Sequence, residues 1–191
     1  MTTYRRNNMI EYDQLCCILS EDFLSISQNI MIEDKENIHK TQYVNIDDGK
    51  RRGLIRQLYR FDLEEKEFLP FFDKTDNSPE GLRKFCDYIL LVGYRSKTYI
   101  LLIELKRGDI SGADKQLRAS EAFMEFLCKT AKRLHEDFGD FDFDNRKIVL
   151  RKIIIKACKS NKMGIQPIQI DKNQDIIFFK SSGIFPLARF L

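Results

Sequence analysis

The chain has 191 residues, of which 43% are hydrophobic, and this predicts one domain, residues 1–191, with a core of its own. Its formal net charge of +3 is the small difference between 32 basic and 29 acidic side chains, which excludes a uniformly basic nucleic-acid-binding protein. Five cysteines without Cys-x-x-Cys spacing and only two histidines argue against a disulfide scaffold or a zinc site.

The cysteines and the N-terminal segment together predict where the protein resides. Most cysteines lie among apolar neighbours, which is typical of reduced core thiols in an intracellular protein. The N-terminus has no uninterrupted apolar core after its arginines, and no stretch approaches the length that spans a bilayer. We therefore expect a soluble, cytoplasmic protein that does not associate with membranes.

The N-terminal third is predicted to form a helix followed by a hairpin. Apolar side chains recur at mixed helical spacing over residues 10–31, which indicates one helix with a break near Ser25. Two strand-like runs, 41–46 and 53–63, flank a turn signal at Asp48-Gly49, so we expect them to pair with each other.

After a predicted loop comes the most informative part of the chain, an apolar β-hairpin interrupted by three charged residues: Asp87, Glu104 and Lys106. If the hairpin closes about Arg95-Ser96, cross-strand pairs have residue numbers that sum to 191, and Asp87 lies opposite Glu104. Strand side chains alternate between faces, so Lys106 shares the face of Glu104.

Two adjacent carboxylates in a low-dielectric site require a divalent cation, a shared proton or a neighbouring cation. Mg²⁺ fits best, because it is commonly held by one or two carboxylates and takes further ligands from water and phosphate. Lys106 could then orient or help deprotonate a water, and the resulting chemistry is metal-assisted hydrolysis of a phosphodiester. A structural ion pair between Asp87 and Lys106 would use the same residues and remains an alternative.

A long helix is predicted next, over residues 112–136, from apolar residues at three- and four-residue steps. Ser111, with Asp114 three residues later, is the predicted N-cap. Lys115 and Arg118 lie in the first turns, close to the end of the charged strand, where they could contact a nucleic-acid backbone.

The remaining segments are predicted strands. Residues 147–157 form the most hydrophobic β-branched run and indicate a central buried strand. Residues 165–170 and 175–179 indicate a final C-terminal β-hairpin. The apolar tail, 184–191, is expected to pack back onto the domain or to form a dimer contact.

The order of Asp87, then Glu104-Leu105-Lys106 on the next strand, then a long helix that carries Gln116 early, resembles the PD-(D/E)xK nuclease superfamily. This resemblance implies an α/β fold with a restriction endonuclease-like core, in which a mixed central sheet is flanked by helices in αβββαβ order. It also implies a Mg²⁺- or Mn²⁺-dependent nuclease that acts on nucleic acid, with DNA favoured over RNA, in repair or defence.

Carried over residue by residue, the resemblance makes Asp87 and Glu104 the metal-binding acids and Lys106 the catalytic lysine. The Leu105 carbonyl becomes a further metal ligand, and Gln116 lies near the metal or the DNA backbone. Many members add an acid from the first helix, for which Glu11 and Glu21 are both candidates.

Two further questions stay open at the level of sequence. A homodimer would allow the chain to cut two strands. The alternative function is a non-catalytic nucleic-acid-binding or protein-interaction module that keeps the same fold.

Overall fold

A computed structural model describes residues 10–27, 29–32, 42–61, 85–107, 109–138, 147–157, 169–171, 175–181 and 183–191. The described helices are α1 (Ile10–Ile18) and α2 (Ala113–Leu134), with short 3₁₀-helices η1 (Glu21–Phe23) and η3 (Leu187–Arg189). The described strands are β1 (Ile30–Ile32), β2 (Gln42–Asp47), β3 (Ile55–Arg60), β4 (Tyr88–Tyr94), β5 (Lys97–Lys106), β6 (Ile148–Ala157), β7 (Gln169–Asp171), β8 (Ile176–Ser181) and β9 (Ile184–Pro186).

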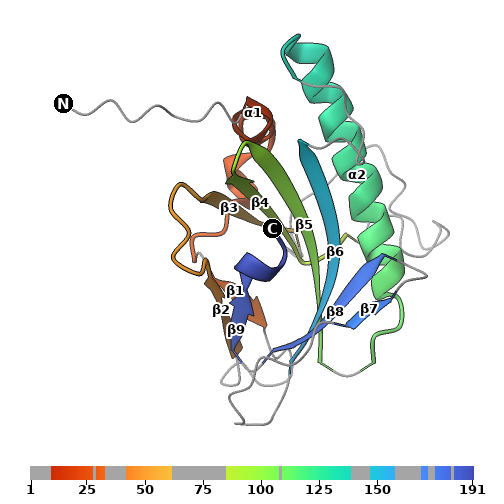
Figure 1. The fold of residues 1–191 in the computed structure, drawn as a ribbon. Coiled ribbons are helices and arrows are strands. Elements are labelled where there is room, and N and C mark those ends of the chain that lie inside the picture. The colour runs from red at the N-terminus through yellow and green to blue at the C-terminus, as the bar shows by residue number, and fades with distance from the viewer. Residues whose placement is uncertain are drawn as a thin grey trace, which may run out of the picture.

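The strands form a six-stranded mixed sheet in the order β3-β4-β5-β6-β8-β7 and a three-stranded sheet in the order β1-β2-β9. In the larger sheet, β3, β4 and β5 are antiparallel neighbours, whereas β5, β6 and β8 run parallel. The long helix α2 connects β5 to β6 and lies along one face of this sheet (Figure 1). The chain is therefore an α/β protein, as predicted.

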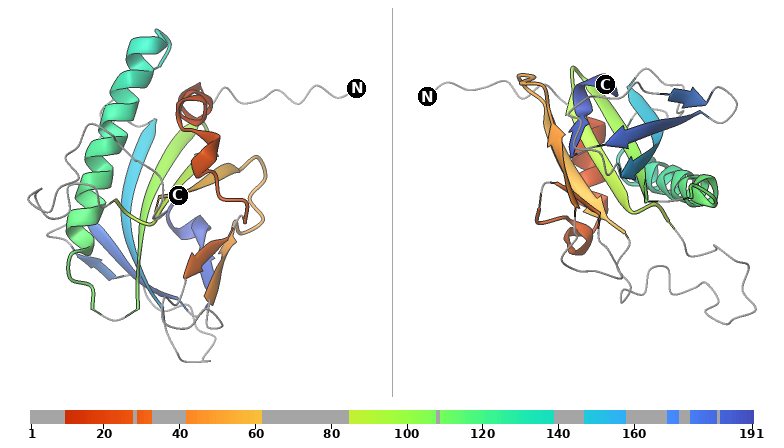
Figure 2. Two further views of the ribbon diagram at one scale, coloured as in Figure 1. Left: turned by 180° about the vertical axis from the view of Figure 1, so that it is seen from behind. Right: turned by 90° about the horizontal axis from the view of Figure 1, so that it is seen from below.

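Both faces of the larger sheet are covered. The helices α1 and α2 lie on one side of this sheet, and the smaller sheet and the C-terminal residues lie on the other (Figure 2). Leu91 and Leu102 belong to the core on the helix side, and Leu90 and Leu101 to the core on the other side. All residues of β4 are buried, which explains why this strand is a continuous apolar run in the sequence.

The predictions for the second half of the chain agree with the described elements. The strand β6 lies between β5 and β8, in the central position expected from its β-branched run. The strands β7 and β8 pair antiparallel as the final hairpin, although residues 165–168 and 172–174 of that prediction lie outside the described residues. No helix in the described ranges is both long and apolar enough to cross a membrane.

The single helix predicted over 10–31 is wrong, because α1 ends at Ile18. The Ser20 hydroxyl accepts a hydrogen bond from the Asp22 amide and starts η1, after which Leu24 bridges to Tyr59 on β3. The mixed spacing of apolar residues in this segment therefore comes from a helix, a 3₁₀-helix and a strand that each bury their own side chains.

The hairpin predicted over 41–63 is also wrong, since β2 pairs with β1 and β9 while β3 pairs with β4. The turn signal itself is real: the Asp47 carboxylate accepts from the Gly49 amide, and Gly49 has a φ of 63°. Two more left-handed residues, Lys50 with a φ of 54° and Gly53 with a φ of 75°, follow before β3 begins, and the two strands enter different sheets. Residues 41, 62 and 63 lie outside the described residues.

The N-cap of α2 differs from the prediction. It is Gly112, at a φ of 76°, and it makes no side-chain cap. The Ser111 hydroxyl instead donates to the carboxylate of Asp109, two residues earlier.

The C-terminal tail packs back onto the domain, as one of the two predicted outcomes. The strand β9 lies parallel to β2, and Phe185, Leu187 and Phe190 are buried. The ring of Phe185 stacks on that of Phe190, with centroids 4.6 Å apart, and meets Phe179 of β8 edge-on. The tail therefore helps to close the core on the face of the larger sheet opposite α2.

We expect Phe185→Ala to lower the free energy of unfolding by about 3 to 5 kcal/mol, because it removes a fully buried ring from this core. Urea unfolding followed by circular dichroism measures the change. The control is Ile184→Ala, at a neighbouring residue that is 51% exposed and should change stability by less than about 0.5 kcal/mol. Equal effects of the two substitutions would contradict this account of the tail.

Candidate active site

The register of the β4–β5 hairpin decides where the charged residues lie. The pairing runs from Tyr94 with Lys97 to Tyr88 with Ile103 and ends there, one residue short of Asp87 and Glu104. The same register, continued by one residue, would place Asp87 opposite Glu104. Arg95 and Ser96 form the turn with φ values of 50° and 60°, the positive values that a tight type I′ hairpin turn requires. This is the register predicted from the sequence.

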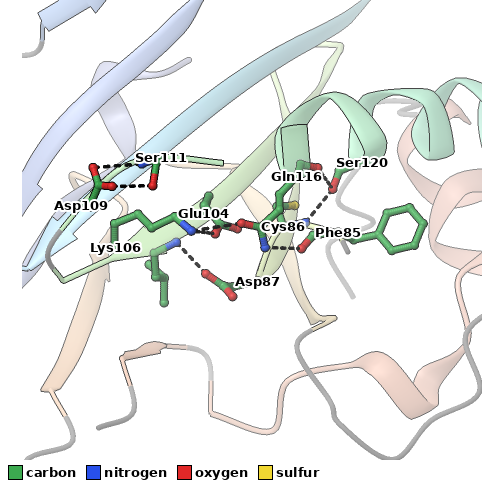
Figure 3. Close-up of polar contacts among 10 residues, drawn as sticks. Phe85, Cys86, Asp87, Glu104, Lys106, Asp109, Ser111, Gln116 and Ser120 are labelled. Carbon is green, nitrogen blue, oxygen red and sulfur yellow. Dashed lines mark hydrogen bonds and ion pairs between the residues drawn. The ribbon is translucent and has the colours of Figure 1, made fainter. Parts of the chain in front are cut away.

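Glu104 and Lys106 form an ion pair on one face of β5. Glu104 is 1% exposed, and its Oε1 atom lies 2.8 Å from the Lys106 Nζ atom (Figure 3). A buried carboxylate without a cation would be costly, so the ammonium group of Lys106 stabilises the charged form of Glu104.

The side chain of Asp87 contacts a backbone group of β5. Its Oδ2 atom accepts a hydrogen bond of 2.6 Å from the Leu105 amide (Figure 3). Burial, together with the charges of Glu104 and Asp87, raises the pKa of the neighbouring Cys86 thiol to about 12, against lowering by hydrogen bonds with the Ser120 hydroxyl and the Ile103 backbone.

Gln116, from the first turns of α2, connects the charged strand to the residue before Cys86. Its Oε1 atom accepts from Lys106 Nζ at 3.0 Å, and its Nε2 atom donates to the Phe85 carbonyl at 3.3 Å. Residues from β5, α2 and the segment entering β4 thus converge on one cluster, as Figure 3 shows. We name Asp87, Glu104, Lys106 and Gln116 the acid–lysine cluster.

Sequence reasoning missed Ser120, which holds this cluster against the helix. The Ser120 side chain is fully buried; its hydroxyl accepts from the Cys86 amide at 2.8 Å and donates to the Gln116 carbonyl at 2.9 Å. The signal was a small polar residue one helical turn after Gln116, on a face that is otherwise apolar.

The two proposed backbone contacts of α2 lie near the cluster but outside it. Lys115 and Arg118 are exposed and flank Gln116 in the first turns of the helix. Residues one and two positions apart on a helix do not share a face, so neither side chain points the way that Gln116 does toward Lys106.

Of the two candidate acids of the N-terminal region, Glu11 lies elsewhere in the fold. Glu11 pairs at 3.3 Å with Lys147, whose carbonyl accepts from the Thr98 amide near the start of β5. Because a strand rises about 3.3 Å per residue, this is about 20 Å along β5 from Glu104, so Glu11 does not join the cluster. Glu21 is exposed at the start of η1, which meets the sheet at β3 through Leu24.

The donor set of the cluster fits a hard divalent cation with few protein ligands. Among the described residues, no three histidine, cysteine, aspartate or glutamate side chains are grouped to hold a metal ion. The carboxylates of Asp87 and Glu104 and the Leu105 carbonyl supply only oxygen donors, which suits Mg²⁺ or Mn²⁺ with water and phosphate as the other ligands. A cation here would compete with Lys106 for Glu104 and with the Leu105 amide for Asp87.

We expect Ser120→Ala to destabilise the protein by about 1 to 3 kcal/mol, because the buried Cys86 amide loses its acceptor. Thermal unfolding followed by circular dichroism measures the loss. Thr130→Ala, at a half-buried site on the same helix, serves as the control and should have a smaller effect. An unchanged stability of the Ser120 variant would show that the contact contributes nothing.

Comparisons of the chain with protein-family models, with curated proteins and with solved structures find no match. The interpretation of the acid–lysine cluster therefore rests on its own geometry and on the motif that its residues form.

Proposed function

We propose that the protein is a Mg²⁺- or Mn²⁺-dependent nuclease of the PD-(D/E)xK type that hydrolyses phosphodiester bonds, with DNA as the favoured substrate. One observation carries the proposal: Asp87 accepts from the amide of Leu105, the residue between Glu104 and Lys106, at 2.6 Å, and Lys106 lies 2.8 Å from Glu104. Two acids and a lysine gathered at adjoining strand ends are the groups that metal-assisted hydrolysis requires.

The order of the elements supports a restriction endonuclease-like core. A first helix, α1, precedes three antiparallel strands, β3 to β5, and α2 then leads to β6, which runs parallel to β5. Apart from β1 and β2, which lie between α1 and β3 in sequence and form part of the smaller sheet, this is the succession that an αβββαβ core would have.

Each residue of the cluster has a distinct role in the proposed reaction. Asp87, Glu104 and the Leu105 carbonyl would hold the cation, which when bound polarises the phosphate and activates water. Lys106 would orient the attacking water and offset charge that develops on the phosphate. Gln116, hydrogen-bonded to Lys106 at 3.0 Å, would fix the position of the ammonium group. The resemblance implies products with a 5′-phosphate and a 3′-hydroxyl.

The proposal predicts that labelled DNA is cleaved in Mn²⁺ or Mg²⁺ and not in EDTA. Asp87→Asn, Glu104→Gln and Lys106→Gln should each reduce the cleavage rate by at least roughly 100-fold, because each removes a group that acts on the reacting phosphate or water. Single- and double-stranded DNA and RNA, run in parallel on denaturing gels, identify the substrate.

The matched control for these variants is Glu125→Gln, which removes an acid from an exposed pair with Lys129 on α2 and should leave cleavage unchanged. Cleavage that persists in EDTA, or in all three cluster variants, would refute the metal mechanism.

A second candidate function is a non-catalytic nucleic-acid-binding or protein-interaction module with the same fold. The observation that favours it is that protein groups already engage both acids: Lys106 pairs with Glu104 at 2.8 Å, and the Leu105 amide donates to Asp87 at 2.6 Å. A structural ion pair of this kind holds a fold together without any metal.

Calorimetric titration with Mn²⁺ distinguishes the two candidates. A nuclease should bind Mn²⁺ at a site that Asp87→Asn abolishes, since this substitution removes one anionic ligand. The Glu125→Gln variant should bind as the wild type does. Absence of Mn²⁺ binding to the wild type would favour the non-catalytic module.

A further inference from the structure

Three lysines lie in register across neighbouring parallel strands. Lys106 of β5 pairs with Lys156 of β6, and Lys156 pairs with Lys180 of β8. These strands lie side by side in the sheet (Figure 1), and neighbouring strands are about 4.8 Å apart. The three side chains therefore start within about 10 Å of one another. We name them the lysine row.

The lysine row lies on the same face of the larger sheet as the acid–lysine cluster. Paired residues of neighbouring strands project to the same side of a sheet, and residues two apart on a strand share a face. Two residues before the outer lysines, Ile154 and Phe178 pack in the core beneath α2. The row therefore begins at Lys106 and extends over β6 and β8 on the α2 side, away from Asp87.

The outer two lysines differ from the other lysines of this face in their partners. Lys106 is paired with Glu104, and Lys152 donates to Glu121 of α2 at 2.9 Å. Within the described ranges, neither Lys156 nor Lys180 lies within ion-pair distance of a carboxylate.

The carboxylate of Asp109 does not neutralise the row. Asp109 is exposed, and both of its oxygens accept from Ser111. These hydrogen bonds are the main cause of the lowered pKa of Asp109, and the charge of Lys156 contributes only a minor part. Asp109 therefore offsets the charge of Lys156 only in part, and no described carboxylate lies within ion-pair distance of Lys156 or Lys180.

Like charges at directly paired positions of adjacent strands destabilise a sheet. An anion with regularly repeated charges, bound across the strand ends, would relieve this repulsion. A nucleic-acid backbone has this character, with one charge at each phosphate, and lysine side chains commonly neutralise it.

We infer that the phosphate backbone of the substrate strand runs across the ends of β5, β6 and β8. The phosphate to be cleaved lies at the acid–lysine cluster, and the phosphates next to it on one side contact Lys156 and then Lys180. This inference rests on the proposed function, because Lys106 belongs both to the cluster and to the row. It adds a direction for the strand and two binding residues on elements that are distant from the motif in sequence.

The test measures binding of a short fluorescein-labelled duplex by anisotropy, in EDTA so that no cleavage occurs, over a series of salt concentrations. Lys156→Gln/Lys180→Gln should weaken binding about tenfold at low salt and make the slope of log K against log salt shallower by about 1.8, since two phosphate contacts are lost. Lys156→Arg/Lys180→Arg keeps both charges and should retain the slope.

The matched control is Lys97→Gln/Lys129→Gln, which changes the net charge by the same amount at two exposed residues outside the row. It should keep the wild-type slope. Thermal unfolding of Lys156→Gln/Lys180→Gln should occur at or above the wild-type temperature, because the substitution removes a repulsion.

Wild-type affinity and slope in Lys156→Gln/Lys180→Gln would overturn the inference, as would loss of binding to the same degree in the control. Tighter binding of polyglutamate than of the duplex would also overturn it, in favour of an acidic protein partner. The proposed function fails separately, if Asp87→Asn cleaves DNA at the wild-type rate, because that variant leaves Lys156 and Lys180 intact.

Discussion

The pairing register between β4 and β5 is the constraint on which the candidate site depends. Continued by one residue, it would set Asp87 opposite Glu104, and it puts Lys106 on the face of Glu104. A slip of one residue would move Glu104 and Lys106 to the opposite face of the sheet. Two features prevent this slip: the tight turn at Arg95-Ser96, with its positive φ values, and the burial of both faces of the hairpin, which matches each side chain to one layer of the core.

Two side chains of the helix α2 hold the polar groups of this hairpin in place by hydrogen bonds. Gln116 connects Lys106 to the Phe85 carbonyl, and Ser120 accepts from the Cys86 amide. Lys106, which pairs with Glu104, and the segment that leads into Asp87 are thus both hydrogen-bonded to α2. A buried carboxylate such as Glu104 is tolerated because its counter-charge is itself held in position, so desolvation of the ion pair is offset by hydrogen bonds.

Local sequence signals predicted some elements and misplaced others, for reasons visible in the structure. The central strand β6 was predictable from its continuous β-branched run, and the long helix α2 from its helical period over many residues. The segment 10–31 was mistaken for one helix because short elements bury apolar residues at spacings that merge in sequence. The strands β2 and β3 were wrongly paired because a turn signal indicates where the chain reverses and does not choose which strand becomes the neighbour.

The sequence by itself determined the hairpin and its register, and therefore which strand ends bring Asp87 and Glu104 together, because these follow from turn chemistry and from the two-residue period of a strand. It also brought Gln116 into consideration through its place early on the following helix. Only the tertiary structure decided that Glu11 lies far from the cluster, that Ser120 supports it, and that Lys106, Lys156 and Lys180 stand side by side. Those relations depend on the order of strands in the sheet and on helix docking, which are set by packing between segments remote in sequence.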